Sequence, residues 1–185
     1  GCYTDPSPGH YRVAEGYIHD AQCVIYEGPD NDHTGKEVCF NSAEGNVVIA
    51  DVTEKQNPKT IGFKRQIDMQ YSHQGWLTED QAYFLMNDEL DETNLGRNTK
   101  TYIWDVRDLE DPKFMGFYEH SSSSIDHNLY IKGNFAYESN YNSGLQILDV
   151  SNVDNADLKR VAYFDTQPHS DQPTFAGTWS NYPYF

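Results

Sequence analysis

The sequence predicts an all-β fold, a β-propeller of four-stranded blades with about three complete blades and two partial ones. Three observations predict it: a motif that recurs at a constant interval, short apolar strands between turn residues, and no 3.6-residue apolar period. The first marker of the repeat is a histidine before an apolar run, at His19, His73 and His127. Four-stranded repeats of about 40 to 55 residues are typical of propeller blades.

Two further markers recur in the same order within each repeat. An apolar strand ending in Asp-Val comes first, at residues 47–52, 101–106 and 145–150. A short aromatic strand follows it, at residues 61–63, 115–118 and 161–164. Gly, Asn, Asp and Pro turns separate these runs, which is typical of strands joined by tight connections. Each repeat is therefore expected to form four short antiparallel strands.

Residues 1–185 are expected to form a single propeller portion, which the repeats divide into units. The expected boundaries of the complete units are about 19–70, 73–124 and 127–175, with partial blades at 1–18 and 176–185. A β-sandwich is the alternative, but sandwiches do not repeat their motifs at a fixed interval. Because propellers usually have about 4 to 8 blades, we expect a piece of a longer protein, completed by missing blades or by a partner subunit.

Composition restricts the classes of partner. The chain has 29 Asp and Glu residues against 13 Lys and Arg, a formal net charge of −16. Nucleic acids and anionic membranes need clustered basic residues, so neither is expected to bind. No apolar run approaches the length of about 18 residues that a membrane-spanning helix requires.

Several longer motifs resemble those of a known family. They lie at residues 19–23, 71–80, 87–92, 126–130 and 179–183. These stretches are similar to the choice-of-anchor B family, whose members carry LVIVD-type repeats. The resemblance implies a β-propeller and an exported bacterial protein, held at the cell surface by a C-terminal anchor that varies between members. It implies no particular reaction.

The three cysteines bear on the compartment. Cys23 aligns with Ile131 of the third repeat and Cys39 with Tyr137, positions that the turn at residues 133–134 is expected to set opposite each other. Opposed cysteines on adjacent strands can form a disulfide, and a disulfide fits an extracellular location. Two buried thiols are the alternative. Cys2 is left over, and its partner is expected outside this chain.

Polar residues are expected to gather on one face of the propeller. The start of the first strand of each blade and its second hairpin loop both lie on that face. The predicted binding face comprises His19, Asp20, His73, Asp126, His127 and Asn140. The three histidines have two interpretations: ligands of a transition metal that keeps an open position, or structural residues that hydrogen-bond the next blade. Recurrence once per unit favours the structural role.

The loop after the second strand of the middle repeat is strongly acidic, with Asp88, Glu89, Asp91 and Glu92. Oxygen-only ligands favour Ca²⁺, so these residues are a candidate calcium site; a solvated acidic loop is the alternative. Residues 30–35 have the alternating spacing of a calcium loop. That motif is weak, because Asn41 stands where the twelfth-position Glu belongs.

The sequence favours a binding or scaffold module on the cell surface, stabilised by calcium and directed at another surface protein or a polysaccharide. Trp76, Trp179 and the aromatic tail at residues 182–185 can stack on sugars, although packing between blades is the commoner use of such rings. A metal-dependent hydrolase or lyase with a histidine-lined site is one alternative function. A subunit of an extracellular assembly is the other.

Overall fold

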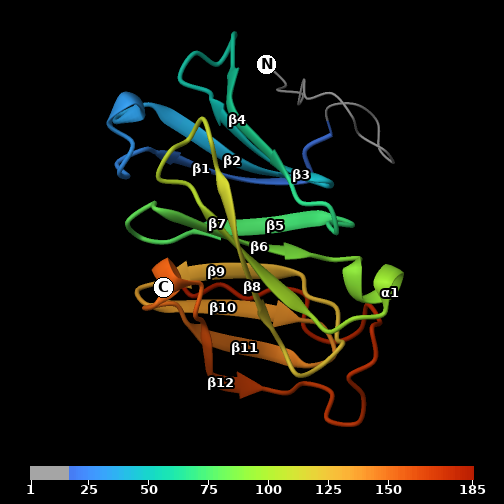
Figure 1. The fold of residues 1–185 in the computed structure, drawn as a ribbon. Coiled ribbons are helices and arrows are strands. Elements are labelled where there is room, and N and C mark those ends of the chain that lie inside the picture. The colour runs from blue at the N-terminus through green and yellow to red at the C-terminus, as the bar shows by residue number, and fades with distance from the viewer. Residues whose placement is uncertain (1–16) are drawn as a thin grey trace.

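The computed structural model describes residues 17–185, which fold into three four-stranded antiparallel sheets with almost no helix (Figure 1). Sheet 1 contains β1 (Asp20–Ile25), β2 (Glu37–Ala43), β3 (Asn46–Asp51) and β4 (Lys59–Arg65). Sheet 2 contains β5 (Ser72–Leu77), β6 (Tyr83–Asp88), β7 (Lys100–Asp105) and β8 (Lys113–Glu119), with the short helix α1 (Asp91–Leu95) between β6 and β7. Sheet 3 contains β9 (Asn128–Lys132), β10 (Phe135–Asn140), β11 (Gly144–Asp149) and β12 (Lys159–Phe164). Two single 3-10 turns, Asn31–His33 and Val153–Asn155, complete the described elements. The predicted all-β class and the four strands per repeat are confirmed.

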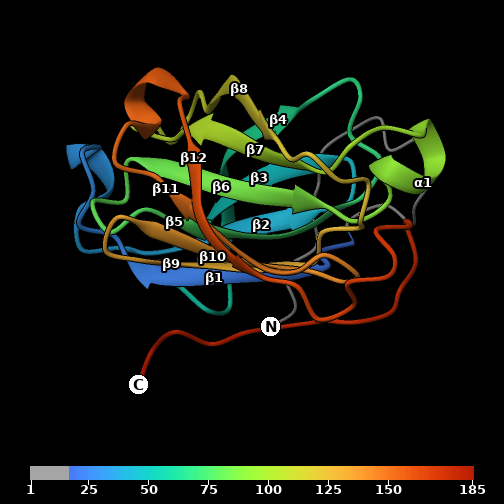
Figure 2. The same ribbon diagram turned by 90° about the horizontal axis from the view of Figure 1, so that it is seen from below.

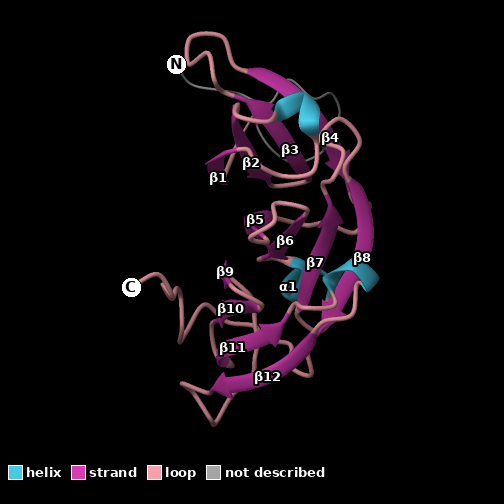
Figure 3. Ribbon diagram, turned by 90° about the vertical axis from the view of Figure 1, so that its left-hand side faces the viewer, coloured by secondary structure: helices cyan, strands magenta, loops and turns pink. Residues whose placement is uncertain are grey.

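In each sheet the strands pair in chain order, so the first strand lies at one edge and the last at the other. Figure 3 shows β1, β5 and β9 along one side of the molecule and β4, β8 and β12 along the opposite side. The three sheets lie one after another in Figure 1, and β5 contacts β1, β2 and β9. The starts of equivalent strands therefore come close together in space.

Sheet 2 is packed against a neighbouring sheet on each face. Its strands contribute to both contacts, because alternate residues of a strand point to opposite sides. Phe84 and Trp104 pack with sheet 1, in a cluster that includes Phe40 and Ile49. Their neighbours Leu85 and Ile103 pack instead with sheet 3; the other main members of that cluster are Leu129, Ile131 and Leu148. This two-sided burial explains why the strands of sheet 2 are apolar without alternation.

Side chains of one sheet also satisfy backbone groups of the next. Oε1 of Gln22 accepts a hydrogen bond from the Leu77 amide at 2.7 Å, and Oε1 of Gln74 accepts one from the Leu129 amide at 2.8 Å. Since an unpaired backbone amide in such an interior is costly, these bonds fix how far each sheet is shifted along its neighbour.

The predicted disulfide is confirmed. Cys23 lies directly opposite Cys39 in the β1–β2 ladder, and the two sulfurs are bonded. The register expected for the third repeat is wrong by one residue, because Ile131 pairs with Ala136 and not with Tyr137. The hairpin between β9 and β10 turns through two residues, whereas β1 and β2 are joined by a longer loop that contains Asn31–His33. Cys2 lies outside the described residues.

The chain after β12 turns back and runs past the side formed by the first strands (Figure 2). Residues 179–185 form no strand but lie beside sheet 3, where Nδ2 of Asn181 donates to the Tyr137 carbonyl at 3.0 Å. Lys132 Nζ also donates to the Pro183 carbonyl at 2.8 Å. This tail places Trp179 next to the histidine of sheet 3.

Candidate metal centre

The three repeat histidines stack in one row across the sheets. The ring centroids of His19 and His73 are 4.1 Å apart, and those of His73 and His127 are also 4.1 Å apart. Each ring stands at or beside the start of a first strand, so the constant interval in sequence becomes a constant step in space.

The structural role expected for the histidines is present on one nitrogen of two rings. Nδ1 of His19 lies 2.8 Å from the carbonyl oxygen of His73, in the next sheet. Nδ1 of His127 lies 2.7 Å from the carbonyl oxygen of Trp179 in the tail. A carbonyl only accepts, so both Nδ1 atoms carry the proton and each Nε2 keeps a lone pair. This is the arrangement in which a histidine can ligate a metal.

Glu89 completes a cluster with two of these rings. Its Oε1 lies 3.5 Å from Nε2 of His127, and its Oε2 lies 3.7 Å from Nε2 of His73. All three side chains are at least five-sixths buried, with Glu89 the most exposed at 15 %. One ligand atom from each lies within 4.8 Å of the others, a spacing that can hold a metal ion. The described residues contain one further group of this kind, discussed below.

Tyr141 fixes the carboxylate from the other side. Its hydroxyl donates to Oε1 of Glu89 at 3.1 Å, and its ring packs edge-on against His127 with centroids 5.2 Å apart. Tyr141 has a backbone φ of 25°, which is uncommon for a bulky residue. Its carbonyl accepts bonds from Gly144 and Thr178, and these hold the strained turn in place. Tyr141 was not among the predicted site residues. The sequence feature that could have identified it is its position in the loop after β10.

The electrostatics of the cluster favour neutral imidazoles. Burial, together with the neighbouring histidines, lowers the pKa of His73 to about 3. Burial likewise lowers the pKa of His127 to about 4. Both rings are therefore uncharged at neutral pH, as ligation requires. Burial raises the pKa of the Glu89 carboxyl, so a cation beside it would relieve the cost of its charge.

A hydrogen bond from the tail currently occupies the lone pair of His127. The indole Nε1 of Trp179 donates to Nε2 of His127 at 2.5 Å. Trp179 is 66 % exposed, so the indole can leave this position without uncovering a core. A metal that binds through Nε2 of His127 must displace it. Around these groups lies an open pocket of about 550 Å³ whose lining includes Asp20, Asn128 and Ser180.

The four carboxylates of the acidic loop lie in different surroundings. Asp88 accepts hydrogen bonds from the backbone amides of Gln70, Tyr71 and Leu90, so it holds the loop together. Glu89 faces the histidines. Asp91 and Glu92 open helix α1 and are buried, at 0 % and 1 % exposure.

Two members of the predicted binding face lie in the interior instead. Asp126 is fully buried and accepts a hydrogen bond from Nδ2 of Asn87 at 2.6 Å. Asn140 is also buried, at 1 % exposure. Asp20 does line the pocket, and one of its carboxylate oxygens accepts from the Ala21 amide. Sequence position placed these side chains at the correct end of the sheets, but it did not indicate their burial.

The second group with metal-like spacing joins sheets 1 and 2. Nε2 of His33 lies 2.6 Å from Oε1 of Glu110, and Asp30 lies beside them. Both carboxylate oxygens of Asp30 already accept backbone bonds, from Asp32 and from Leu109. Through these contacts the weak calcium-like motif at residues 30–35 connects its loop to sheet 2.

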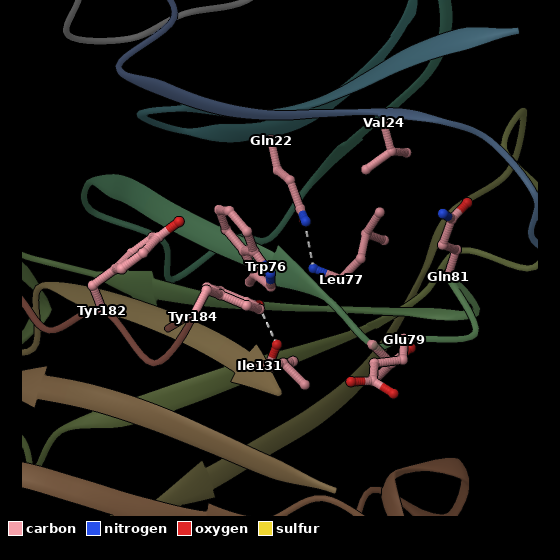
Figure 4. A pocket seen from close by; sticks show the side chains of 10 residues that line it. Gln22, Val24, Trp76, Leu77, Glu79, Gln81, Ile131, Tyr182 and Tyr184 are labelled. Atoms are coloured by element: carbon pink, nitrogen blue, oxygen red, sulfur yellow. Dashed lines mark hydrogen bonds between the residues drawn. The ribbon is translucent and has the colours of Figure 1, made fainter. Parts of the chain in front are cut away.

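A separate pocket of about 440 Å³ opens where sheets 1 and 2 meet the tail (Figure 4). Trp76, Tyr182 and Tyr184 line one part of it, and Val24 and Leu77 line another. Trp76 packs edge-on against Tyr130 with centroids 4.9 Å apart, so its ring is partly used in packing. Tyr182 remains 57 % exposed.

No family model matches the chain, and no curated protein sequence matches it significantly. Among the described residues, no helix is long and apolar enough to cross a membrane.

Proposed function

We propose that this chain is part of an exported β-propeller that binds a divalent transition metal at His73, Glu89 and His127 and uses it in a hydrolase or lyase reaction. The propeller assignment is supported by four-stranded sheets that repeat along the chain and meet at their first strands. The disulfide between Cys23 and Cys39 supports export. The similarity of the sequence motifs to choice-of-anchor B proteins supports a location at the cell surface.

The position of Glu89 beside His127 carries the metal proposal. Nε2 of His127 presents a lone pair, and a carboxylate oxygen lies 3.5 Å away. A cation between these two atoms would be held by both of them once the Trp179 indole has left Nε2, which it occupies in this structure. Two imidazoles and one carboxylate are the protein ligands of many catalytic zinc sites, and of the facial triad that binds non-haem iron.

Such a set leaves coordination positions open toward the pocket. A metal ion there lowers the pKa of a bound water, or polarises a substrate oxygen. The Tyr141 hydroxyl, hydrogen-bonded to Glu89, orients the carboxylate and stands next to the same space. Water activation and a neighbouring proton donor together fit hydrolysis or elimination.

Metal analysis tests this proposal. The 185-residue chain, loaded with Zn²⁺ and then dialysed, is expected to retain about one equivalent by mass spectrometry. His73→Gln and His127→Gln are expected to lose at least about tenfold in affinity, since loss of an outer-shell partner alone typically costs about that much. His169→Gln is the matched control, because His169 is exposed. Unchanged zinc affinity in both site variants would refute the metal centre.

A non-catalytic binding module is the second candidate, favoured by the aromatic pocket of Figure 4. Exposed Tyr182 and the ring of Trp76 offer surfaces on which sugar rings can stack. Binding of soluble cell-surface polysaccharides by the wild-type chain, abolished by Tyr182→Ala and unaffected by His73→Gln, would favour this function. A large discrete species in sizing chromatography would favour an extracellular assembly instead.

A further inference from the structure

We propose that the outer face of sheet 3 is the interface of a homodimer, in which it packs against the same face of a second copy of this chain. The outer face is the side of sheet 3 that is turned away from sheet 2. Its apolar residues are Phe135, Tyr137, Leu145, Ile147, Val161 and Phe164. The inference does not depend on the metal ion proposed above.

The register of the strands places these side chains on one side of sheet 3. Tyr137 of β10 pairs directly with Ile147 of β11, so the two residues share a face. The adjacent residues Ala136 and Leu148 point to the opposite side, where they pack in the cluster shared with sheet 2. Tyr137 and Ile147 therefore point away from sheet 2.

The equivalent positions in sheets 1 and 2 are covered by the next sheet. Ile147 corresponds to Ile49 of sheet 1 and Ile103 of sheet 2, because each of them lies at the β-bulge of the last strand. Ile49 is 0 % exposed and packs in the cluster that joins sheets 1 and 2. Ile103 is also 0 % exposed and packs in the cluster that joins sheets 2 and 3. Ile147 is only half-buried, since no sheet follows sheet 3 in residues 17–185.

The bulge residues themselves show the same difference. The pairing skips one residue of each last strand, which is Ile61 in β4, Met115 in β8 and Val161 in β12. Ile61 and Met115 pack against the clusters that join their sheets to the next one. Val161 is 49 % exposed, and Phe164 on the same strand is 69 % exposed. Side chains at the positions that join the other sheets are therefore open to solvent in sheet 3.

Continuity with the two interfaces inside the chain indicates that another β-sheet covers this face. Figure 1 shows sheet 3 at one end of the row of sheets. The tail lies beside β9 and β10, where Asn181 binds the Tyr137 carbonyl, but the outer side chains of β11 and β12 stay at least partly exposed. Apolar sheet faces pack against each other about 10 Å apart. A second copy supplies an identical uncovered face, and two-fold symmetric interfaces join like surfaces.

The charges on this face permit contact between two copies. One row of paired residues carries Lys132, Asp149 and Lys159, so the face is slightly basic although the whole chain has a net charge of −16. With the two-fold axis across the strands, the charged row of each copy lies at the opposite end of the interface from that of the other. Repulsion between the acidic remainders of the two copies is screened by salt, so the dimer is expected to tighten as ionic strength rises.

Sedimentation velocity of the 185-residue chain tests the inference. Over the micromolar range, the 21.2-kDa species is expected to give way to one of twice that mass. Ile147→Lys and Val161→Lys each place a charge within the apolar face. Each is expected to weaken dimerisation at least about tenfold, because an unpaired charge would be buried in the interface.

Ile67→Lys is the matched control, because Ile67 lies in the loop after β4 and is 87 % exposed. It should dimerise as the wild type does. Thermal unfolding at a concentration where all chains are monomeric checks that each variant folds; Val161, exposed at the edge of the sheet, is the safer substitution.

Two results would overturn the inference. One is a wild-type chain that stays monomeric throughout the range at high salt. The other is a folded Val161→Lys chain that associates as tightly as the wild type. His73→Gln should dimerise normally even where it loses zinc, so this proposal and the metal centre fail separately.

Discussion

Trp179 makes two hydrogen bonds to the ring of His127, one to each nitrogen. Its carbonyl oxygen lies 2.7 Å from Nδ1, and its indole Nε1 donates to Nε2 at 2.5 Å. The first bond sets the tautomer that leaves Nε2 available as a ligand, and the second occupies that same lone pair. In sequence, Trp179 stands where the next repeat would have its histidine. The tail therefore fixes the tautomer of His127 that suits metal binding, and it also occupies the nitrogen that would bind the metal.

Replacing this indole should strengthen metal binding. Trp179→Phe keeps the backbone carbonyl and an aromatic ring but removes the Nε1–H donor. Zn²⁺ affinity is expected to rise about tenfold, the equivalent of one hydrogen bond that no longer competes. Competition titration against a zinc indicator measures the change. Tyr182→Phe, another substitution in the tail, serves as the control. Equal or weaker zinc binding by Trp179→Phe would show that the indole does not compete with the metal.

The packing of sheet 1 on sheet 2 depends on a glycine. A Cβ atom at Gly62 would lie 1.9 Å from the carbonyl oxygen of Leu109, closer than any real contact. Gly62→Ala is therefore expected to destabilise the chain by about 2 kcal/mol or more, as overpacked cores do. Gly45→Ala is the control, because nothing lies within 4 Å of its Cβ position. Chemical denaturation compares the two, and equal stabilities would contradict the packing described.

Loss of the disulfide should lower stability measurably. Cys23 and Cys39 are separated by 16 residues, and closing a loop of about this size stabilises a folded chain by roughly 3 kcal/mol in the chain-entropy description. The double variant Cys23→Ser/Cys39→Ser should unfold at correspondingly lower denaturant concentration. Reductant should destabilise the wild-type chain and leave the double variant unaffected. A wild-type chain indifferent to reductant would argue against the bond.

The buried carboxyls predict an unusual dependence of stability on pH. In the folded chain the pKa of Glu92 is raised to about 12 and that of Asp88 to about 7, chiefly by burial. Unfolded carboxyls lose their protons near pH 4, so between pH 7 and 9 the folded state binds more protons than the unfolded state. Stability must therefore fall as pH rises, by up to about 1.4 kcal/mol per pH unit for each retained proton.

Denaturation at several pH values measures this slope. His73 and His127 contribute little to it, since their pKa values are lowered in the folded state and the ordinary histidine pKa of about 6.5 already lies below this pH range. Glu92→Gln should flatten the slope. A stability that rises from pH 7 to pH 9 would show that these carboxyls are ionised in the folded state.

The amino-acid sequence was sufficient to predict which strands each repeat forms. The three markers identified the strands that became β1, β5 and β9, the apolar strands β3, β7 and β11, and the short strands β4, β8 and β12. The pairing of Cys23 with Cys39 was also predicted correctly, although it was argued from a third-repeat register that is wrong by one residue. Such features are local, because strand periodicity and turn residues act over a few positions. The one-residue error at Ile131 arose because register depends on the length of each individual hairpin loop.

The contacts of the polar residues depend on tertiary packing and could not be predicted from local sequence. Asp88, Glu89 and Glu92 are almost adjacent in sequence, yet one binds backbone amides, one faces two histidines and one is buried in the first turn of α1. Which way each points depends on a short helix and on sheets contributed by distant parts of the chain. The spacing of His73 and His127 was likewise fixed by how two sheets pack, since a repeat length sets the order of the sheets but not the distance between them.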